Sequence, residues 1–243
     1  MPTEHIVKSF DEELQKLNRT LAQMGGAAEA QLEMAVQAFA QRNSELAQQV
    51  MQADERLDQF EREIDNEVVR MLALRQPMAS DLRNVLSALK VAADLERIGD
   101  YSANIAKRAI AISQLPPVRP AQGIVRMGRM VQELIKDVLD AFVERNVDNA
   151  VAAWARDEEL DDLYTSLFRE VLTYMMEDPR TITSCTHLLF IAKNIERIGD
   201  HATNIAETLH FLVAGQPLTK IRPKGDQSSF AVVSPDILRG GEP

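Results

Sequence analysis

The sequence has little of what several large classes of protein require. Its 243 residues include one cysteine, one tryptophan, three tyrosines and ten glycines. A lone Cys185 cannot form an intrachain disulfide bond. The net charge of −10 leaves no basic face to neutralise the phosphates of a nucleic acid, so nucleic-acid binding is not expected.

Long apolar runs are also missing. Charged residues interrupt every apolar stretch well before the roughly 20 residues that a membrane-spanning helix needs. The first residues, MPTEHIVKSFDEEL, are charged and do not resemble an apolar leader. The G-x-S-x-G, P-loop and dinucleotide-binding motifs do not occur. We therefore expect a cytoplasmic protein without covalent catalysis.

What the chain does contain is a set of strong helix formers, because Ala, Leu, Glu, Gln, Arg and Met abound. The hydrophobic share of 45% is enough for a buried core. An apolar stripe at helical spacing runs from Leu46 to Met71 and predicts one buried helix face. The composition predicts an all-α fold.

The chain contains an internal duplication. Residues 94–106, DLERIGDYSANIA, return at 194–206 as NIERIGDHATNIA, and AFAQRNSELA at 38–47 matches AFVERNVDNA at 141–150. Three prolines within residues 115–120, LPPVRP, separate the two copies. We predict a first unit at residues 1–115, a linker at 116–120 and a second unit at 121–214. Residues 215–243 are predicted to form an irregular tail, with local packing through 230–233 as the alternative.

Each unit is predicted to contain three helices. In the first unit, a helix covers residues 3 to about 41 with a possible disturbance at Gly25 and Gly26, and a second runs from Asn43 or Ser44, as cap, to about residue 75. Ser80 is the expected cap of the third helix. In the second unit the helices are expected at about 121–145, 148–176 and 183–214. Short connections make neighbouring helices antiparallel, so the prediction is two tandem three-helix bundles.

Pairs of acidic residues recur four apart on the second and third helices of each unit. Asp54 and Asp58 lie as far before Pro77, in the turn, as Asp100 and Glu96 lie after it. Residues equally far from the turn of an antiparallel hairpin lie at one level, so four carboxylates are expected to meet in each unit. The candidate metal ligands are Asp54, Asp58, Glu96, Asp100, Asp157, Asp161, Glu196 and Asp200.

Four converging carboxylates raise one another's pKa and need a cation, an arginine or solvent beside them. Oxygen ligands favour hard ions such as iron, manganese or magnesium over zinc. Gly99 and Gly199 suggest that a neighbouring backbone or a bulky ligand comes close. The alternative is that Arg or Lys side chains pair with the carboxylates on a solvated surface. The candidates for additional ligands or supporting groups are Asn104, Asn204, Arg97 and Arg197.

Other polar residues give weaker signals. Glu207 and His210 match the Glu-x-x-His element of di-iron bundles, but such bundles use it twice and only one copy occurs here. A metal-binding oxidoreductase or iron-storage bundle is the alternative function, and the single Glu-x-x-His element speaks against it. His201, next to Asp200, is expected at an interface or behind the ligands. His187 and Cys185 are expected in or near the core.

The duplicated motifs, together with RQPMASDLR at residues 75–83, resemble the PhoU family, regulators of bacterial phosphate uptake. The resemblance covers residues 5 to 214. It implies two three-helix bundles, usually in a homodimer, whose acidic motifs bind iron or zinc clusters in some relatives. Asn194 replaces the Asp94 of the first copy, so the two sites are expected to differ in charge and affinity.

The resemblance also implies a non-enzymatic role. The expected function is negative regulation of the phosphate-starvation response and of phosphate uptake. The protein would act as an adapter between the ATPase subunit of the high-affinity phosphate ABC transporter and a sensor histidine kinase. Recruitment to the inner membrane would be peripheral and only through these partners.

Overall fold

The computed structural model describes residues 2–219, 225–226 and 228–230. This part of the chain contains no strand, and the predicted all-α fold is confirmed. Two short 3-10 helices, η1 (Pro179–Thr181) and η2 (Ser228–Phe230), accompany the α-helices. The α-helices are α1 (Pro2–Gln41), α2 (Ser44–Arg75), α3 (Ala79–Ser113), α4 (Ala121–Glu144), α5 (Val147–Glu177) and α6 (Ile182–Ala214).

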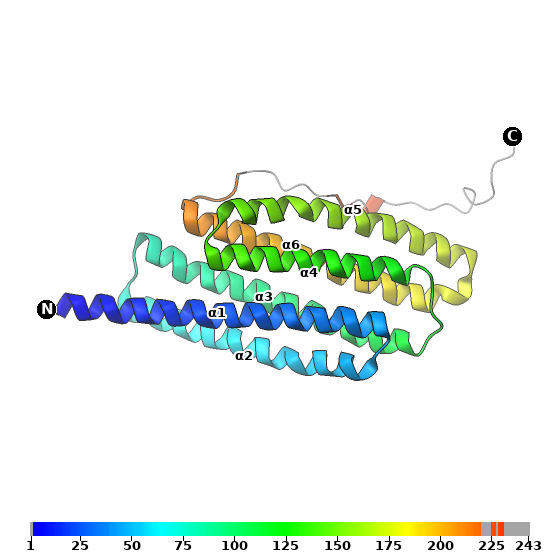
Figure 1. Cartoon of the computed structure of the whole chain (residues 1–243), viewed down its shortest axis with the longest axis horizontal. Helices are drawn as coiled ribbons and strands as arrows, with labels where there is room; N and C mark the ends of the chain where they lie inside the picture. The colour runs from blue at the N-terminus through cyan, green and yellow to red at the C-terminus, as the bar shows by residue number, and fades with distance from the viewer. Residues whose placement is uncertain (1, 220–224, 227, 231–243) are drawn as a thin grey trace.

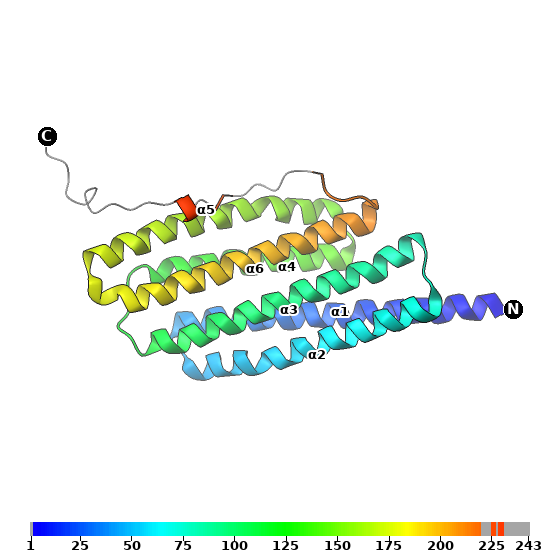
Figure 2. The ribbon, with the colours of Figure 1, turned by 180° about the vertical axis from the view of Figure 1, so that it is seen from behind.

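The helices form two antiparallel three-helix bundles that pack side by side. Helices α1, α2 and α3 form the first bundle and α4, α5 and α6 the second (Figure 1). Helices α3 and α6 lie along each other between the bundles, and α1 also contacts α4 (Figure 2). The two copies of the repeated motif are therefore on the helices that join the halves.

The helices form where the sequence supplies an apolar stripe and a cap. In α2, Val50, Leu57 and Ile64 are buried at helical spacing. The Asn43 side chain accepts hydrogen bonds from the backbone N–H groups of Glu45 and Leu46, both at 3.0 Å. These bonds satisfy two of the donors that a helix start leaves unpaired, so the predicted cap at Asn43 is confirmed.

Two local predictions were wrong. Helix α1 passes through Gly25 and Gly26 without a break. Ser80 lies inside α3, which begins at Ala79 after Met78, and no side chain caps this end. Gln76 adopts a left-handed conformation with φ 46°. The turn through Pro77 is therefore short, and α3 begins at Ala79, before the predicted cap at Ser80. The other predicted helix ends lie within one residue of those observed.

The described part of the tail returns to the second bundle. After α6 ends at Ala214, the described residues 225–226 and 228–230 lie near α5, and 228–230 form η2 (Figure 1). The Gly225 N–H donates to Asp161 Oδ2 over 3.0 Å, and Thr165 Oγ1 donates to the Gly225 carbonyl over 3.4 Å. Residues 231–233 of the alternative packing prediction lie outside the described residues. The described contacts bring the tail onto the second acidic motif.

Candidate functional site

The first acidic cluster, defined as Asp54, Asp58, Glu96 and Asp100, lies on the facing surfaces of α2 and α3. Asp54 is beside Gly99, because a Cβ placed on Gly99 would lie 3.4 Å from Asp54 Oδ1. Burial raises the pKa of Asp54, and the nearby Asp100 and Asp58 raise it further. The two helices therefore bring their carboxylates to one level of the hairpin.

The carboxylates of this cluster raise one another's pKa. Burial and the neighbouring Asp100 raise the pKa of Glu96 to about 7, against the lowering effect of Arg97. Glu61, one turn beyond Asp58 on α2, is a fifth carboxylate, and burial raises its pKa as well. Sequence reasoning missed Glu61, although its spacing of three from Asp58 was a usable signal. A cation at this place would relieve the repulsion.

Arg97 pairs with two of the carboxylates on the surface. Its Nη1 lies 3.0 Å from Asp100 Oδ2 and its Nε lies 3.5 Å from Glu96 Oε2. This is the pairing that the sequence left open as the alternative to a metal. The Arg97 side chain is 57% exposed, so these ion pairs are weak and the guanidinium is free to swing into solvent.

Gln31 on α1 contacts the first cluster from a third helix. Its Nε2 donates to Asp54 Oδ1 over 3.1 Å and to the Val50 carbonyl over 3.2 Å. Its Oε1 is buried without a hydrogen-bond partner among the described residues. Sequence reasoning missed this residue, whose signal was a glutamine within the apolar stripe of α1. An unsatisfied oxygen beside carboxylates is the donor chemistry that a hard cation prefers.

The second acidic cluster, defined as Asp157, Asp161, Glu196 and Asp200, lies between α5 and α6, and all its members except the partly exposed Asp200 are buried. Asp157 is 1% exposed, Asp161 3% and Glu196 5%. Burial and the neighbouring Asp157 raise the pKa of Asp161 to about 6. Burial also raises the pKa of Glu196 to about 7. Asp157, Asp161 and Glu196 are thus less exposed to solvent than the matching residues of the first cluster.

A lysine lies at the second cluster. Lys193 Nζ is 2.8 Å from Glu196 Oε2 and 3.0 Å from Asp226 Oδ2. Burial lowers the pKa of Lys193, but hydrogen bonds with Glu196 and Asp226 outweigh this effect and raise it, so the group is an ammonium ion. Sequence reasoning missed Lys193, although the first copy of the motif has Ala93 at this place.

The two repeated glycines let a side chain of the preceding helix come close. A Cβ on Gly199 would lie 2.6 Å from Leu160 Cδ2 and 2.7 Å from Asp157 Oδ1. At Gly99, a Cβ would overlap Leu57. The close approach expected from the glycines is therefore made by side chains of the neighbouring helix.

The two clusters differ in how well they fit a metal ion. Within the described residues, no three His, Cys, Asp or Glu side chains are gathered as a ready-made metal site. The first cluster offers carboxylates, an unsatisfied amide oxygen and an exposed Arg97 that can move away. Its donors fit a hard cation once those side chains turn inward. In the second cluster the Lys193 ammonium lies 2.8 Å from Glu196 Oε2, and the Gly225 N–H donates to Asp161 Oδ2, so two of the carboxylates already face a positive or donor group.

Two of the four expected supporting groups, Asn204 and Arg197, make contacts across the seam between α3 and α6. Asn204 Nδ2 donates to Asp94 Oδ1 over 3.2 Å, and His201 Nδ1 lies 2.8 Å from the same oxygen. The Arg197 guanidinium lies 5.8 Å from the centre of the Tyr101 ring. Asn104 Oδ1 accepts from Lys107 over 3.4 Å. The difference between Asp94 and Asn194 therefore acts at the seam and not inside a cluster.

The Glu-x-x-His pair serves two separate contacts. Glu207 accepts a hydrogen bond from Trp154 Nε1 over 2.9 Å, while His210 Nδ1 lies 3.1 Å from the Gln216 carbonyl. Cys185 is fully buried, and burial lowers the pKa of His187. None of these residues belongs to the acidic clusters.

In the part of the chain that the structure describes, no helix is both long enough and apolar enough to cross a membrane. The contacts that hold the fold together are those of packed amphipathic helices.

The fold and clusters define a class: helical repeat proteins in which two three-helix bundles each carry an acidic hairpin. The family model described as the PhoU domain matches residues 21–109 and 124–209, one match in each bundle. The chain belongs to the PhoU family.

Relatives match almost from end to end. A phosphate-specific transport system accessory protein PhoU homolog of Caulobacter vibrioides is 52% identical over 225 residues, which are 92% of this chain and 98% of the relative. The homolog of that name from Rhizobium meliloti is 49% identical over 226 residues, 93% of this chain and 95% of the relative.

Solved structures show the same architecture. The crystal structure of PhoU from Pseudomonas aeruginosa matches with a TM-score of 0.83 and 42% identity, covering 85% of this chain and all of that one. The phosphate transport system regulatory protein PhoU from Streptococcus pneumoniae matches with a TM-score of 0.81 and 30% identity, covering 87% of this chain and all of that one. The predicted pair of three-helix bundles is thus seen in experimental structures of the family.

Proposed function

We propose that this protein is a non-enzymatic negative regulator of phosphate uptake and of the phosphate-starvation response. The observation that carries the proposal is the similarity, over more than nine tenths of the chain, to proteins named as accessory to phosphate-specific transport. Under this proposal the protein acts in the cytoplasm and represses phosphate-scavenging genes while phosphate is plentiful.

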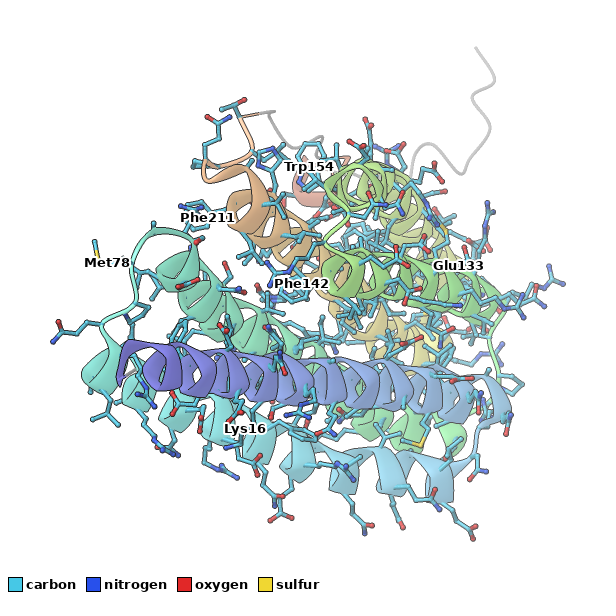
Figure 3. All side chains as sticks on the ribbon, turned by 60° about the vertical axis from the view of Figure 1, so that its left-hand side comes forward. Lys16, Met78, Glu133, Phe142, Trp154 and Phe211 are labelled. Atoms are coloured by element: carbon cyan, nitrogen blue, oxygen red, sulfur yellow. The ribbon has the colours of Figure 1, made fainter. Side chains whose placement is uncertain are left out.

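The protein acts as an adapter between two membrane-bound partners. These are the ATPase subunit of the high-affinity phosphate transporter and a sensor histidine kinase, through which it reaches the inner membrane. Exposed apolar side chains at the α2–α3 end support docking: Val69 is 65% exposed, Leu74 67% and Met78 80%. The Met78 side chain points away from the helices (Figure 3). Such side chains favour contact with another protein. A homodimer is the assembly proposed for the adapter.

A hard cation such as iron, manganese or magnesium is proposed to bind at the first cluster. Asp54, Asp58, Glu96 and Asp100 would hold it, and Gln31 would supply a further oxygen. A bound cation neutralises the repulsion between α2 and α3 and stiffens the hairpin. The carboxylates position the ion, while the exposed Arg97 takes its place when the ion is absent.

The direct test is deletion of the gene in the native host. The expected result is high activity of phosphate-scavenging enzymes in phosphate-rich medium, measured with a chromogenic phosphate ester. Normal repression in the deletion strain would contradict the regulatory role.

The adapter is tested by affinity capture of membrane proteins. We expect the unmodified protein to retain the transporter ATPase and the kinase. Leu74→Asp combined with Met78→Asp should lose at least one of them, because charge opposes apolar docking. The matched control is Val143→Asp, at another exposed apolar residue, 68% exposed, on α4. Equal capture by the unmodified protein, the double variant and the control would show that the α2–α3 end is not the docking surface.

A further inference from the structure

The ammonium group of Lys193 is enclosed on several sides. It lies 2.8 Å from Glu196 Oε2, 3.0 Å from Asp226 Oδ2 and 5.0 Å from the centre of the Tyr164 ring. The Glu196 side chain is 6% exposed and that of Asp226 18%. A charge pair in such a place is screened far less by solvent than one on the surface. Lys193 therefore supplies the positive charge that the buried carboxylates of the second cluster need.

The tail closes the same cluster. The Gly225 N–H donates to Asp161 Oδ2, which occupies an oxygen that a metal ion would use. The Ser228 N–H donates to Asp226 Oδ1 over 2.8 Å and so holds Asp226 beside Lys193. A metal ion entering here would have to displace both an ammonium ion and a backbone donor.

The first half has none of these features among its described residues. Position 93 is an alanine where the second half has Lys193, and Glu61 stands where the second half has Tyr164. The described tail residues Gly225 and Asp226 contact the second cluster. The first cluster therefore lacks an ammonium ion at the position of Lys193, and Arg97 and Arg62, which pair with its carboxylates, are each mostly exposed.

We propose that Lys193 is a tethered counter-ion that takes the place of a metal in the second cluster, so that divalent cations enter only the first cluster. Only the part of this proposal that concerns the first cluster rests on the metal site of the proposed function. It assigns the two halves different tasks: an exchangeable site on α2 and α3, and a permanently neutralised one on α5 and α6.

The reciprocal exchange of positions 93 and 193 tests this directly. The full-length chain and its variants are titrated with Mn²⁺ alone, and the bound equivalents are counted by isothermal titration calorimetry and by loss of the free Mn²⁺ electron paramagnetic resonance signal. We expect one equivalent for the unmodified chain and two for Lys193→Ala. Lys193→Arg, which keeps the positive charge, should stay at one. Ala93→Lys should weaken the first site at least tenfold.

The outcomes separate the inference from the proposed function. Two equivalents in the unmodified chain, or no additional equivalent in Lys193→Ala, would overturn the counter-ion role. Zero equivalents in the unmodified chain with one in Lys193→Ala would support the role of Lys193 and refute metal binding at the first cluster. Circular dichroism of each variant establishes that it is folded before its equivalents are counted.

A second readout needs no metal. Competitive acetylation of the full-length chain, followed by mass spectrometry, compares Lys193 with the exposed Lys107. We expect Lys193 to react at least fivefold more slowly, and Asp226→Ala to remove much of this protection. Equal reaction of both lysines in the unmodified chain would overturn the proposal whatever the metal titration shows.

Discussion

Glu96 and Glu196 occupy matching positions of the two halves, yet the first exposes 18% of its side chain and the second 6%. Arg97, which is mostly exposed, accompanies Glu96, whereas Lys193, which is partly buried, accompanies Glu196. The duplication has thus kept the acidic positions and changed the groups that compensate them. The comparison teaches that equal motifs do not imply equal sites, because the counter-charge comes from residues outside the motif.

The largest expected effect concerns the glycines against which the acidic side chains pack. Gly199→Val should destabilise the fold by about 1–3 kcal/mol, because the added atoms overlap Leu160 and the buried Asp157. Gly99→Val should act in the same direction in the first half. The measurement is urea denaturation followed by circular dichroism.

Gly26 provides the matched control for these substitutions. A Cβ at this helical position meets nothing within 4 Å. Gly26→Val should therefore change the stability by less than about 0.5 kcal/mol, because its Cβ meets no neighbour and valine is a slightly better helix former than glycine. Equal effects at positions 26 and 199 would show that close packing against α5 is unimportant.

The pH dependence of the metal-free protein gives the next effect. The pKa values of Glu96 and Glu196 are raised from 4.5 to about 7, so the folded chain holds these protons more tightly than the unfolded chain. Stability is therefore greatest below about pH 4.5 as far as these groups are concerned, and it falls as pH rises towards 7. Melting temperatures should drop by several degrees between pH 5 and 8, since about 1 kcal/mol corresponds to roughly 2–4 °C in a chain of this size.

Substitution of either glutamate makes this prediction specific. Glu96→Gln and Glu196→Gln should each flatten the pH profile, because the neutral amide has no proton to lose. Asp11→Asn, at an exposed residue on α1, is the control and should leave the slope unchanged. A melting temperature that rises between pH 5 and 8 in the metal-free protein would contradict the assigned burial of these carboxyls.

The seam between the halves should respond more weakly. Asp94→Asn makes the first copy identical to the second at this position and weakens the contacts with His201 and Asn204. The expected loss of stability is about 0.5–1.5 kcal/mol, measured by urea denaturation. Asn194→Asp is the reciprocal variant. An equal loss of stability from both variants would show that positions 94 and 194 do not differ in their contribution to the seam.

The smallest effect on stability is expected at Arg97. Arg97→Gln removes two solvent-exposed ion pairs and should change stability by less than about 1 kcal/mol. It should nevertheless strengthen Mn²⁺ binding at the first cluster several-fold, because the competing guanidinium is gone. Urea denaturation checks the stability and calorimetric titration checks the Mn²⁺ affinity; weaker Mn²⁺ binding would mean that Arg97 supports the ion.

Much of the fold was predictable because local patterns agreed with tertiary packing. The stripe of Val50, Leu57 and Ile64 indicated the buried face of α2, and Asn43 indicated its start. Counting from Pro77 predicted that Asp54 lies near Asp100, and the two carboxylates do interact. Such arithmetic works for an antiparallel hairpin because both helices rise equally per residue.

The groups that distinguish the clusters were not predictable in this way. Gln31 reaches Asp54 from α1, and Asp226 reaches Lys193 from the tail, so both contacts depend on packing between elements distant in sequence. Aligning the two copies would have revealed Ala93 against Lys193, but not the direction of the lysine side chain. Periodicity identifies which residues share a helix face, and it carries no information on which distant element covers that face.

The most direct test of the difference between the clusters is anomalous diffraction from crystals of the full-length protein grown with Mn²⁺. The predicted result is one anomalous peak per chain, beside Asp54, Asp58, Glu96 and Asp100, with Lys193 still paired to Glu196. A peak between Asp161 and Glu196 in the unmodified protein would contradict it.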